Sequence, residues 1–197
     1  SIPMTEESQT EAQELRREPP ELDQEMLARR EAALRHVRKF GDPVLKSRAA
    51  EVEDFDDGLR AEVDRMGLLM NDAIGVGLAA NQVGLLRRFF VYRVEEDGPI
   101  EALANPVITW SSDQEETFEE GCLSLPQVVV EVTRPAQIRV SAQDRFGELV
   151  ELEVDGLEAR IIQHELDHLD GVLIIDRTTR GQRREAMRSL RELGSGF

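Results

Sequence analysis

Apolar residues recur at helical spacing in two segments of the N-terminal half of the chain. The first covers about residues 24–40 and is closed by the turn residues Gly41-Asp42-Pro43. The second covers residues 56–73, and its apolar side chains share one stripe: Leu59, Val63, Met66, Leu69 and Met70. Both segments are predicted to be amphipathic helices. His36 stands among arginines in the first helix, which is typical of an exposed residue rather than of a ligand.

The middle of the chain has the pattern of strands. Aromatic and β-branched residues dominate 88–94 and 128–132, while Pro106 within 102–110 predicts an edge strand or a bend. Apolar and polar residues alternate in 138–142 and again in 150–154, on either side of turn residues, which predicts a hairpin. Residues 75–84 are rich in glycine and alanine, which suits either close backbone approach to a ligand or strand, or a plain turn.

The next predicted helix begins after Asp155 and is apolar around much of its circumference. One stripe holds Leu157, Ile161, His164 and His168, and an adjoining stripe holds Ile162, Leu166 and Leu169. Glu158 three residues after Asp155 predicts a capping box, and Gly171 predicts the end of the helix. A buried helix rarely carries two histidines and three acids, although two hydrogen-bonded core histidines remain an alternative.

These elements predict an α+β fold, with mostly antiparallel sheets around the central buried helix and further helices near both ends. The length of 197 residues suits a single domain at 24–197, preceded by an acidic leader at 1–23 and ending in a basic helix at about 177–195. The formal charge of −16 argues against a nucleic-acid groove. No apolar run is long enough to cross a membrane, and the N-terminal residues lack the pattern of a targeting peptide, so we expect a cytoplasmic protein.

The candidate chemistry lies in Gln163-His164-Glu165-Leu166-Asp167-His168. Side chains four residues apart on a helix are neighbours at about 5–6 Å, so two imidazoles can hold one metal ion. Glu165 lies about 60° around the helix axis from His168 and can reach a water on that metal.

The third ligand decides what this pattern means. Cys122 is the only cysteine, so an intramolecular disulfide is excluded. The thiol is either a small buried hydrophobe, or a ligand or nucleophile. A thiolate with two imidazoles leaves one position of a tetrahedral metal open for water, as in catalytic sites.

With these residues the sequence resembles the peptide deformylase family of the bacterial type. The resemblance covers roughly residues 36–180 and rests on three motifs in the family's order: Gly75-Val76-Gly77-Leu78-Ala79-Ala80-Asn81-Gln82, Glu120-Gly121-Cys122-Leu123-Ser124 and Gln163-His164-Glu165-Leu166-Asp167-His168. Asp42-Pro43-Val44-Leu45 is a further similarity. Where relatives often carry glycines, this chain has Gln127-Val128-Val129-Val130, which affects the rim of the substrate site.

The resemblance implies a metal-dependent hydrolase that removes the N-formyl group from the formylmethionine of nascent polypeptides and releases formate. Cys122, His164 and His168 would bind the metal, and Glu165 would act as general base and then general acid for the attacking water. The Gln82 amide and the Leu123 backbone N–H would stabilise the oxyanion, and the substrate backbone would lie along Gly77. The methionine pocket would be lined by four apolar side chains: Val76, Phe118, Leu157 and Ile161. Glu120 and Arg134 are either a pair that supports the cysteine loop or two surface charges.

The family uses Fe(II) natively and accepts zinc, nickel or cobalt, so one divalent ion per chain is expected. In bacterial relatives a similar C-terminal helix docks on the ribosome. Residues 177–192 hold six arginines against two glutamates, which suggests the same partner, although a solvated face is the alternative. We expect a monomer with no membrane partner.

Two other functions were weighed. A general metallopeptidase would take a histidine or carboxylate as third ligand, and the cysteine motif argues against it. A non-catalytic homologue would be expected to lack Glu165 or Gln82, and both are present.

Overall fold

The structure is a computed structural model that describes residues 23–194. Its helices are α2 (Gln24–Leu34), α3 (Asp57–Asp72), α4 (Gly156–Leu169) and α5 (Arg180–Gly194). Its strands are β1 (Gly77–Ala79), β2 (Phe89–Tyr92), β3 (Glu101–Ser111), β4 (Glu115–Cys122), β5 (Leu125–Pro135), β6 (Gln137–Gln143) and β7 (Leu149–Asp155). The strands form an antiparallel sheet in the order β1-β2-β3-β6-β7 and a separate β4–β5 hairpin. The predicted α+β class is confirmed.

The acidic leader predicted for residues 1–23 lies outside the described residues except for Asp23, which caps α2.

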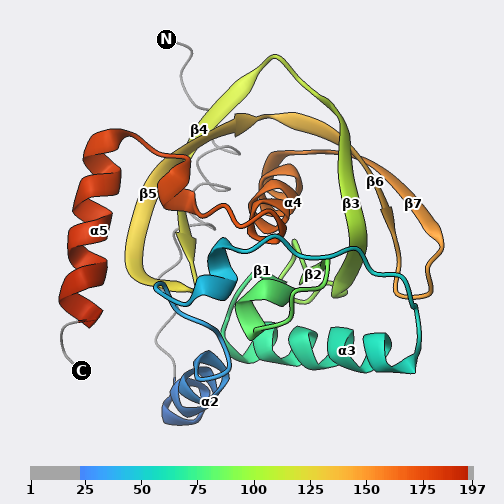
Figure 1. Ribbon diagram of the computed structural model, residues 1–197, viewed down its shortest axis with the longest axis horizontal. Coiled ribbons are helices and arrows are strands. Elements are labelled where there is room, and N and C mark those ends of the chain that lie inside the picture. Colours follow the sequence, from blue (N-terminus) through green and yellow to red (C-terminus); the bar gives the residue numbers. More distant parts are fainter. Residues whose placement is uncertain (1–22, 195–197) are drawn as a thin grey trace.

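The five-stranded sheet separates two apolar clusters, one under α3 and one under α4 (Figure 1). In β2, Phe89 and Val91 belong to the cluster under α3, while Phe90 and Tyr92 belong to the cluster under α4. Because both faces of this strand are covered by helices, its sequence is a continuous apolar run rather than an alternation.

β3 lies between β2 and β6, so the edge position suggested by Pro106 is wrong. The bend is confirmed, because the register with β6 shifts between Ala104 and Val107. Asn105 adopts a positive φ of 50° there, and its amide bonds both backbone groups of Val52. The side-chain amide thus satisfies the backbone groups of a segment that belongs to no strand.

The β4 strand was not predicted from the pattern. Four of its eight residues are glutamates, and glutamates are depleted in strands. β4 pairs with β5 along its length, and a two-residue turn at Leu123 and Ser124 joins them. Strand pairing and the partners of Glu120, described below, override the poor local propensity.

The first helix ends at Leu34 instead of near Phe40. Lys39 Nζ donates to the carbonyl oxygens of Leu34 and Val37, both at 2.6 Å. The chain beyond the helix turns away to donate from Arg38 N to Gln82 O and from Phe40 N to Ser124 O. Tertiary hydrogen bonds therefore replace the last helical turns. His36 is exposed just beyond the helix.

α4 runs through the centre of the molecule, beside the five-stranded sheet and the β4–β5 hairpin (Figure 1). The predicted capping box is wrong: Asp155 makes no side-chain cap, and Glu158 instead accepts a hydrogen bond from the Tyr92 hydroxyl at 3.0 Å. Gly171 follows the helix with φ of 73°, which confirms the predicted end.

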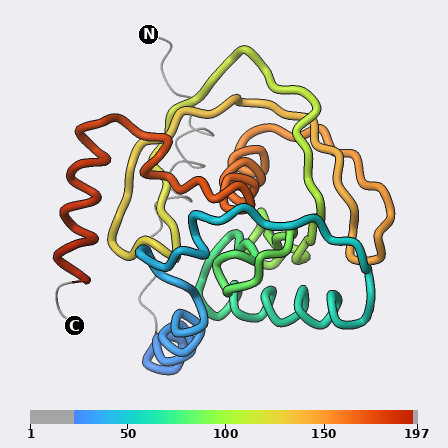
Figure 2. The backbone as a smooth tube through the Cα atoms, viewed as in Figure 1, coloured from blue at the N-terminus to red at the C-terminus, as the bar shows by residue number. Residues whose placement is uncertain are grey.

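Two distant segments lie beside the C-terminal end of α4. The segment before α3 passes this end, where Ala49 N donates to Leu169 O (Figure 2). α5 packs Ala186 and Leu190 into an apolar cluster with β5 and with Leu173 to Ile175. Among the described residues, no helix is long and apolar enough to cross a membrane.

Candidate metal centre

Cys122, His164 and His168 bring three ligand atoms within 4.8 Å of one another. His168 Nε2 lies 3.3 Å from Cys122 Sγ and 3.2 Å from His164 Nε2. A tetrahedral metal with bonds of about 2.0–2.3 Å separates such ligands by about 3.3–3.6 Å, so the donor set fits one ion with an open position. Burial holds the pKa of His168 well below its usual range, with help from the positive charges of His164 and Arg134. Its imidazole is therefore neutral, as a ligand must be.

The cysteine is positioned by the end of the β4–β5 hairpin. The strand register shifts between Gly121 and Cys122, so that Cys122 pairs with Leu125 across the tight turn. Leu123 lies directly in this turn. The helix α4 supplies both histidines, which lie one turn apart with ring centroids 5.0 Å apart. The centre is thus assembled from a hairpin and a helix that are distant in sequence.

Glu165 is buried next to the donor cluster, and its Oε2 atom has no hydrogen-bond partner in the protein. Its other oxygen lies 3.9 Å from His164 Nε2. Burial raises the pKa of Glu165 to about 7, even though the charge of His164 acts in the opposite direction. A carboxylate with a free oxygen and this pKa is suited to taking up and releasing a proton near neutral pH.

Gln82 is held with its amide nitrogen toward the cysteine turn. Its Nε2 lies 3.1 Å from Ser124 Oγ and 3.6 Å from Cys122 Sγ, while its Oε1 accepts from Ala79 N at 3.0 Å. The backbone bonds from Arg38 and Phe40 join the Gln82 and Ser124 segments. The structure thus brings Gln82 and the turn containing Leu123 to the same side of the cysteine.

The predicted substrate residues are less closely grouped. Gly77 lies against the Glu165 side chain. Leu157 and Ile161 are buried in the cluster between α4 and the sheet, whereas Val76 and Phe118 lie outside this cluster. Val76 is partly exposed, and Phe118 packs under the guanidinium of Arg160 at 5.0 Å. A single pocket lined by all of them remains a prediction.

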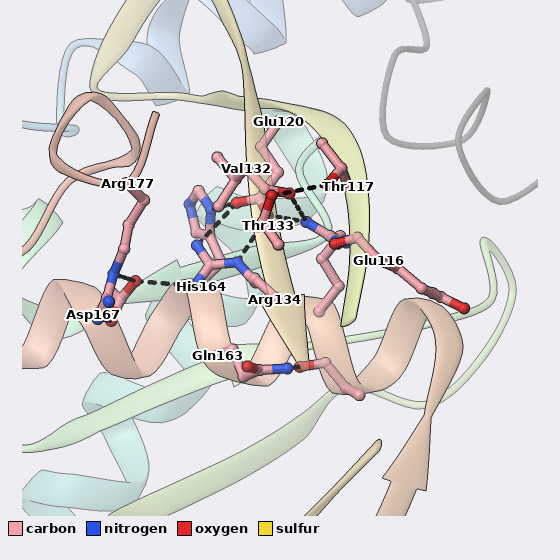
Figure 3. Close-up of polar contacts among 12 residues, drawn as sticks. Glu116, Thr117, Glu120, Val132, Thr133, Arg134, Gln163, His164, Asp167 and Arg177 are labelled. Atoms are coloured by element: carbon pink, nitrogen blue, oxygen red, sulfur yellow. Dashed lines mark hydrogen bonds and ion pairs between the residues drawn. The ribbon is translucent and has the colours of Figure 1, made fainter. Parts of the chain in front are cut away.

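Glu120 forms the centre of a buried polar network (Figure 3). Its carboxylate accepts from Arg134 at 2.7 and 3.0 Å and from Arg160 at 2.6 Å, so the Glu120–Arg134 pair is present. Although burial acts to raise its pKa, hydrogen bonds from His164 and Arg134 hold the pKa of Glu120 well below its usual range. Its Oε1 lies 2.8 Å from His164 Nδ1. This contact orients the ring and leaves Nε2 on the side of the donor cluster, 3.2 Å from His168 Nε2.

The same contact also affects the charge of His164. Burial acts against a positive charge, but the hydrogen bonds to Cys122 and Glu120 raise the pKa of His164 well above its usual range. His164 would therefore have to give up a proton from this pair of residues if it held a metal ion through Nε2.

Three residues of the network were missed from the sequence: Arg160, Asp167 and Arg177. Asp167 lies on the buried helix and accepts from Arg134 at 2.9 Å and from Arg177 at 2.9 and 3.1 Å. An acid on a buried helix requires a cationic partner, which was a usable signal. The sequence pattern does not say which of the chain's arginines provides it.

Comparisons with known proteins agree with this geometry. The family model for polypeptide deformylase matches residues 34–184. Peptide deformylase 1 of Corynebacterium glutamicum is 51% identical over 161 residues, which cover 81% of this chain and 95% of the relative. The crystal structure of peptide deformylase from Thermotoga maritima has a TM-score of 0.70 at 48% identity, covering 73% of this chain and 96% of that one.

A peptide deformylase of Synechococcus elongatus in complex with actinonin superposes with a TM-score of 0.75 at 38% identity, covering 88% of this chain and 89% of that one. All three sequence motifs and the residues of the donor cluster lie inside the region matched by the family model.

Proposed function

The chain belongs to the polypeptide deformylase family, and we propose that Cys122, His164 and His168 hold its metal while Glu165 transfers the proton. The enzyme is a metal-dependent hydrolase that removes the N-formyl group from nascent polypeptides. The observation that carries the residue assignment is the unpartnered Glu165 oxygen buried beside three converging donor atoms. A buried carboxylate with a free oxygen is otherwise unfavourable, which suggests that it has a catalytic role.

These three donors would hold a divalent ion, which would lower the pKa of a bound water to about 7 and so would supply a nucleophile. Glu165 accepts the proton of the attacking water through its free oxygen. It then returns this proton to the amine that leaves, so that formate and a free N-terminus result. Burial raises the pKa of this carboxyl group to about 7 in the metal-free protein, and a metal cation would lower it again, so the group is suited to both steps near neutral pH.

Gln82 and Leu123 are placed to stabilise the negative oxygen of the tetrahedral intermediate. The Gln82 amide is oriented by its bond from Ala79 N, so its N–H groups are directed to the cysteine turn. Leu123 follows Cys122 directly, so one turn sets both a ligand and a backbone donor. Pre-oriented donors of this kind typically contribute about 2.7–4 kcal/mol each to transition-state stabilisation.

The substrate backbone is proposed to run along β1 at Gly77, which lies against the Glu165 side chain. Val76, Phe118, Leu157 and Ile161 are proposed to surround the methionine side chain. Leu157 and Ile161 support this, because they are on the helical stripe that carries both histidines. An apolar pocket separates similar side chains by only about 1–3 kcal/mol per methylene, so related side chains are accepted to a degree.

Fe(II) is proposed as the native ion, with zinc, nickel or cobalt as substitutes. A thiolate with two imidazoles is compatible with each of these metals. The order of preference within this set is a family property, and the donor geometry does not separate them.

The ribosome is proposed as a partner of α5. Arg177 and Arg183 pair with Asp167 and Asp176, so they are occupied inside the protein. The exposed positive face consists of Arg180, Arg184, Arg188 and Arg191, spaced along one side of the helix. Such a face suits the phosphate-rich surface of a ribosome. Because nascent chains are the substrate, we place the activity of a monomeric enzyme in the cytoplasm.

The test is formate release from a formyl-Met peptide by the wild type and by Glu165→Ala and Glu165→Gln. General acid–base catalysis contributes about 10²–10⁴-fold, so kcat is expected to fall by that factor with the metal content unchanged. Glu158→Gln is the control, because it changes a glutamate on the same helix that bonds Tyr92 instead. Full activity in both Glu165 variants would refute the assignment.

A further inference from the structure

A continuous chain of ion pairs connects the surface at the start of α5 with the ring of His164 (Figure 3). It begins at Arg177, whose side chain is 49% exposed, and passes to Asp167, which is nearly buried. Asp167 contacts Arg134, Arg134 contacts Glu120, and Glu120 contacts His164 Nδ1. Every link is 2.7 to 3.1 Å long.

The first link has the geometry of a strong ion pair. Arg177 binds both oxygens of Asp167, with Nη2 on Oδ1 at 2.9 Å and Nε on Oδ2 at 3.1 Å. Arg134 Nη1 shares the Oδ2 atom at 2.9 Å. A two-point contact fixes both the position and the plane of a carboxylate. Without Arg177, Asp167 would keep one arginine partner and could rotate about it.

A rotation of the Asp167 carboxylate would change its contact with Arg134. This guanidinium is buried and divides its N–H groups between Asp167 and Glu120. A buried charge must keep its partners, so a shift of Asp167 changes how Arg134 holds Glu120. Arg160 is a second partner of Glu120 at 2.6 Å, so the carboxylate would shift rather than be released.

The ion pair between Arg177 and Asp167 is not needed to hold α5 in place. The start of α5 has a separate anchor, because Arg183 binds Asp176 Oδ1 at 2.7 Å and the carbonyl oxygen of Ile175 at 3.0 Å. Lys46 also pairs with Asp176. Further along, Ala186 and Leu190 pack into the apolar cluster at β5. Arg177 and Arg183 are thus similar in position and exposure, 49% and 43%, but only Arg177 reaches the Glu120 network.

We propose that Arg177 is a positioning residue for the metal centre, acting on His164 through Asp167, Arg134 and Glu120. The proposal rests on the proposed function in one respect, that His164 is a metal ligand. It extends the set of functional residues to a side chain that is partly exposed and lies on the segment between α4 and α5.

The experiment compares cobalt-loaded wild type with Arg177→Gln, Arg177→Lys and the matched control Arg183→Gln. Cobalt affinity is measured by competition with a chelator, and the site is observed through the thiolate-to-cobalt and d–d absorption bands. Changes beyond the first ligand shell typically weaken metal affinity or activity by about 10–100-fold, and we expect about tenfold for Arg177→Gln because Arg160 still holds Glu120. Its d–d bands are expected to shift and kcat to fall with KM unchanged.

Arg177→Lys should recover part of this loss, because an ammonium restores the charge but not the two-point contact. Arg183→Gln should keep the wild-type spectrum and cobalt affinity, even though both glutamine variants lose a comparable surface ion pair and similar thermal stability. If Arg177→Gln has the spectrum and the cobalt affinity of the wild type, the role of Arg177 is overturned while the metal assignment stands. Absence of the thiolate-to-cobalt band from the wild type would overturn the metal assignment and, with it, the inference.

Discussion

Gly77 faces Glu165 so closely that a Cβ atom at position 77 would lie 2.5 Å from Glu165 Oε1 and 2.8 Å from its carboxyl carbon. Because Gly77 has no side chain, the buried Glu165 carboxylate can occupy the space next to this strand. Gly77 belongs to the glycine-rich motif and Glu165 to the histidine motif, where it is the proposed proton-transfer group, so the contact joins two of the three sequence motifs.

Gly77→Ala is expected to displace the Glu165 carboxylate. A shift of about 1 Å in a catalytic group can reduce the rate by about 100-fold, so kcat should fall by about that factor. The measurement is formate release by the metal-loaded protein. Gly181→Ala is the control, because a Cβ atom at that position meets no neighbour within 4 Å. Wild-type kcat in Gly77→Ala would show that the carboxylate can move without consequence.

Substitution of Gln82 is expected to lower kcat by about 10²–10³-fold, with KM and metal content little changed, if its N–H stabilises the oxyanion. Two variants separate this role from a structural one. Gln82→Met removes all hydrogen bonds, whereas Gln82→Glu retains the oxygen that accepts from Ala79 N but removes the donor. Loss of activity only in the methionine variant would contradict the oxyanion role. Gln137→Met is a control on β6.

The pKa of Glu165 predicts the acid limb of the pH–rate profile. The base must be ionised, and burial raises its pKa to about 7 in the protein without a metal charge. A cation at the donor cluster favours the ionised form of Glu165 and lowers its pKa. The midpoint of the acid limb of the metal-loaded enzyme should therefore lie below pH 7. Below that pKa, kcat/KM should decrease tenfold per pH unit. A profile that is flat down to pH 5 would contradict the assignment.

The same shift predicts a pH dependence of stability in the metal-free protein. The pKa of Glu165 in the folded state lies above its unfolded value of about 4.3, so the folded state binds the extra proton. Its contribution is fully present below the unfolded pKa and is lost as the pH rises through about 7. The difference in unfolding free energy between wild type and Glu165→Gln, measured across this range, should become more favourable to the variant as pH rises.

Oxidation is expected to inactivate the enzyme if Fe(II) is the native metal. Protein purified anaerobically should retain iron and activity, while protein purified in air should lose both through oxidation of the metal or of Cys122. Nickel-loaded enzyme kept in air reports oxidation of the Cys122 thiol separately, because nickel is not oxidised under these conditions. Equal activity and iron content in the two preparations would refute the role of iron.

Replacing Arg180, Arg184, Arg188 and Arg191 together by glutamine should abolish co-sedimentation with ribosomes at low salt. This variant is preferable to truncation after Asp176, because truncation also removes Arg177 and the apolar contacts of Ala186 and Leu190. Wild-type binding should weaken steeply as salt rises, since phosphate contacts release counterions. Arg139→Gln with Arg145→Gln removes one exposed and one half-buried arginine elsewhere as a control. Unchanged sedimentation of the quadruple variant would exclude this face.

Most elements could be predicted from the chain because their side-chain periodicity reflects which face is buried. This holds for α3, for the β6–β7 hairpin and for the stripes of α4. Two elements differed where tertiary contacts outweigh the local pattern. β4 is acidic but is paired along its length, and the helix before Phe40 stops early because the backbone bonds the segments of Gln82 and Ser124.

The sequence by itself determined the candidate donors of the proposed metal centre. His164 and His168 must be neighbours wherever α4 forms, and Cys122 is the one cysteine in the chain. Only the tertiary structure decided that Cys122 meets His168, which is 46 residues away, and that three arginines surround the acids behind the histidines. Local spacing carries no information about which distant charges will share a buried site. Burial selects those partners, because an acid such as Glu120 or Asp167 can lie inside the fold only where cations from other segments converge on it.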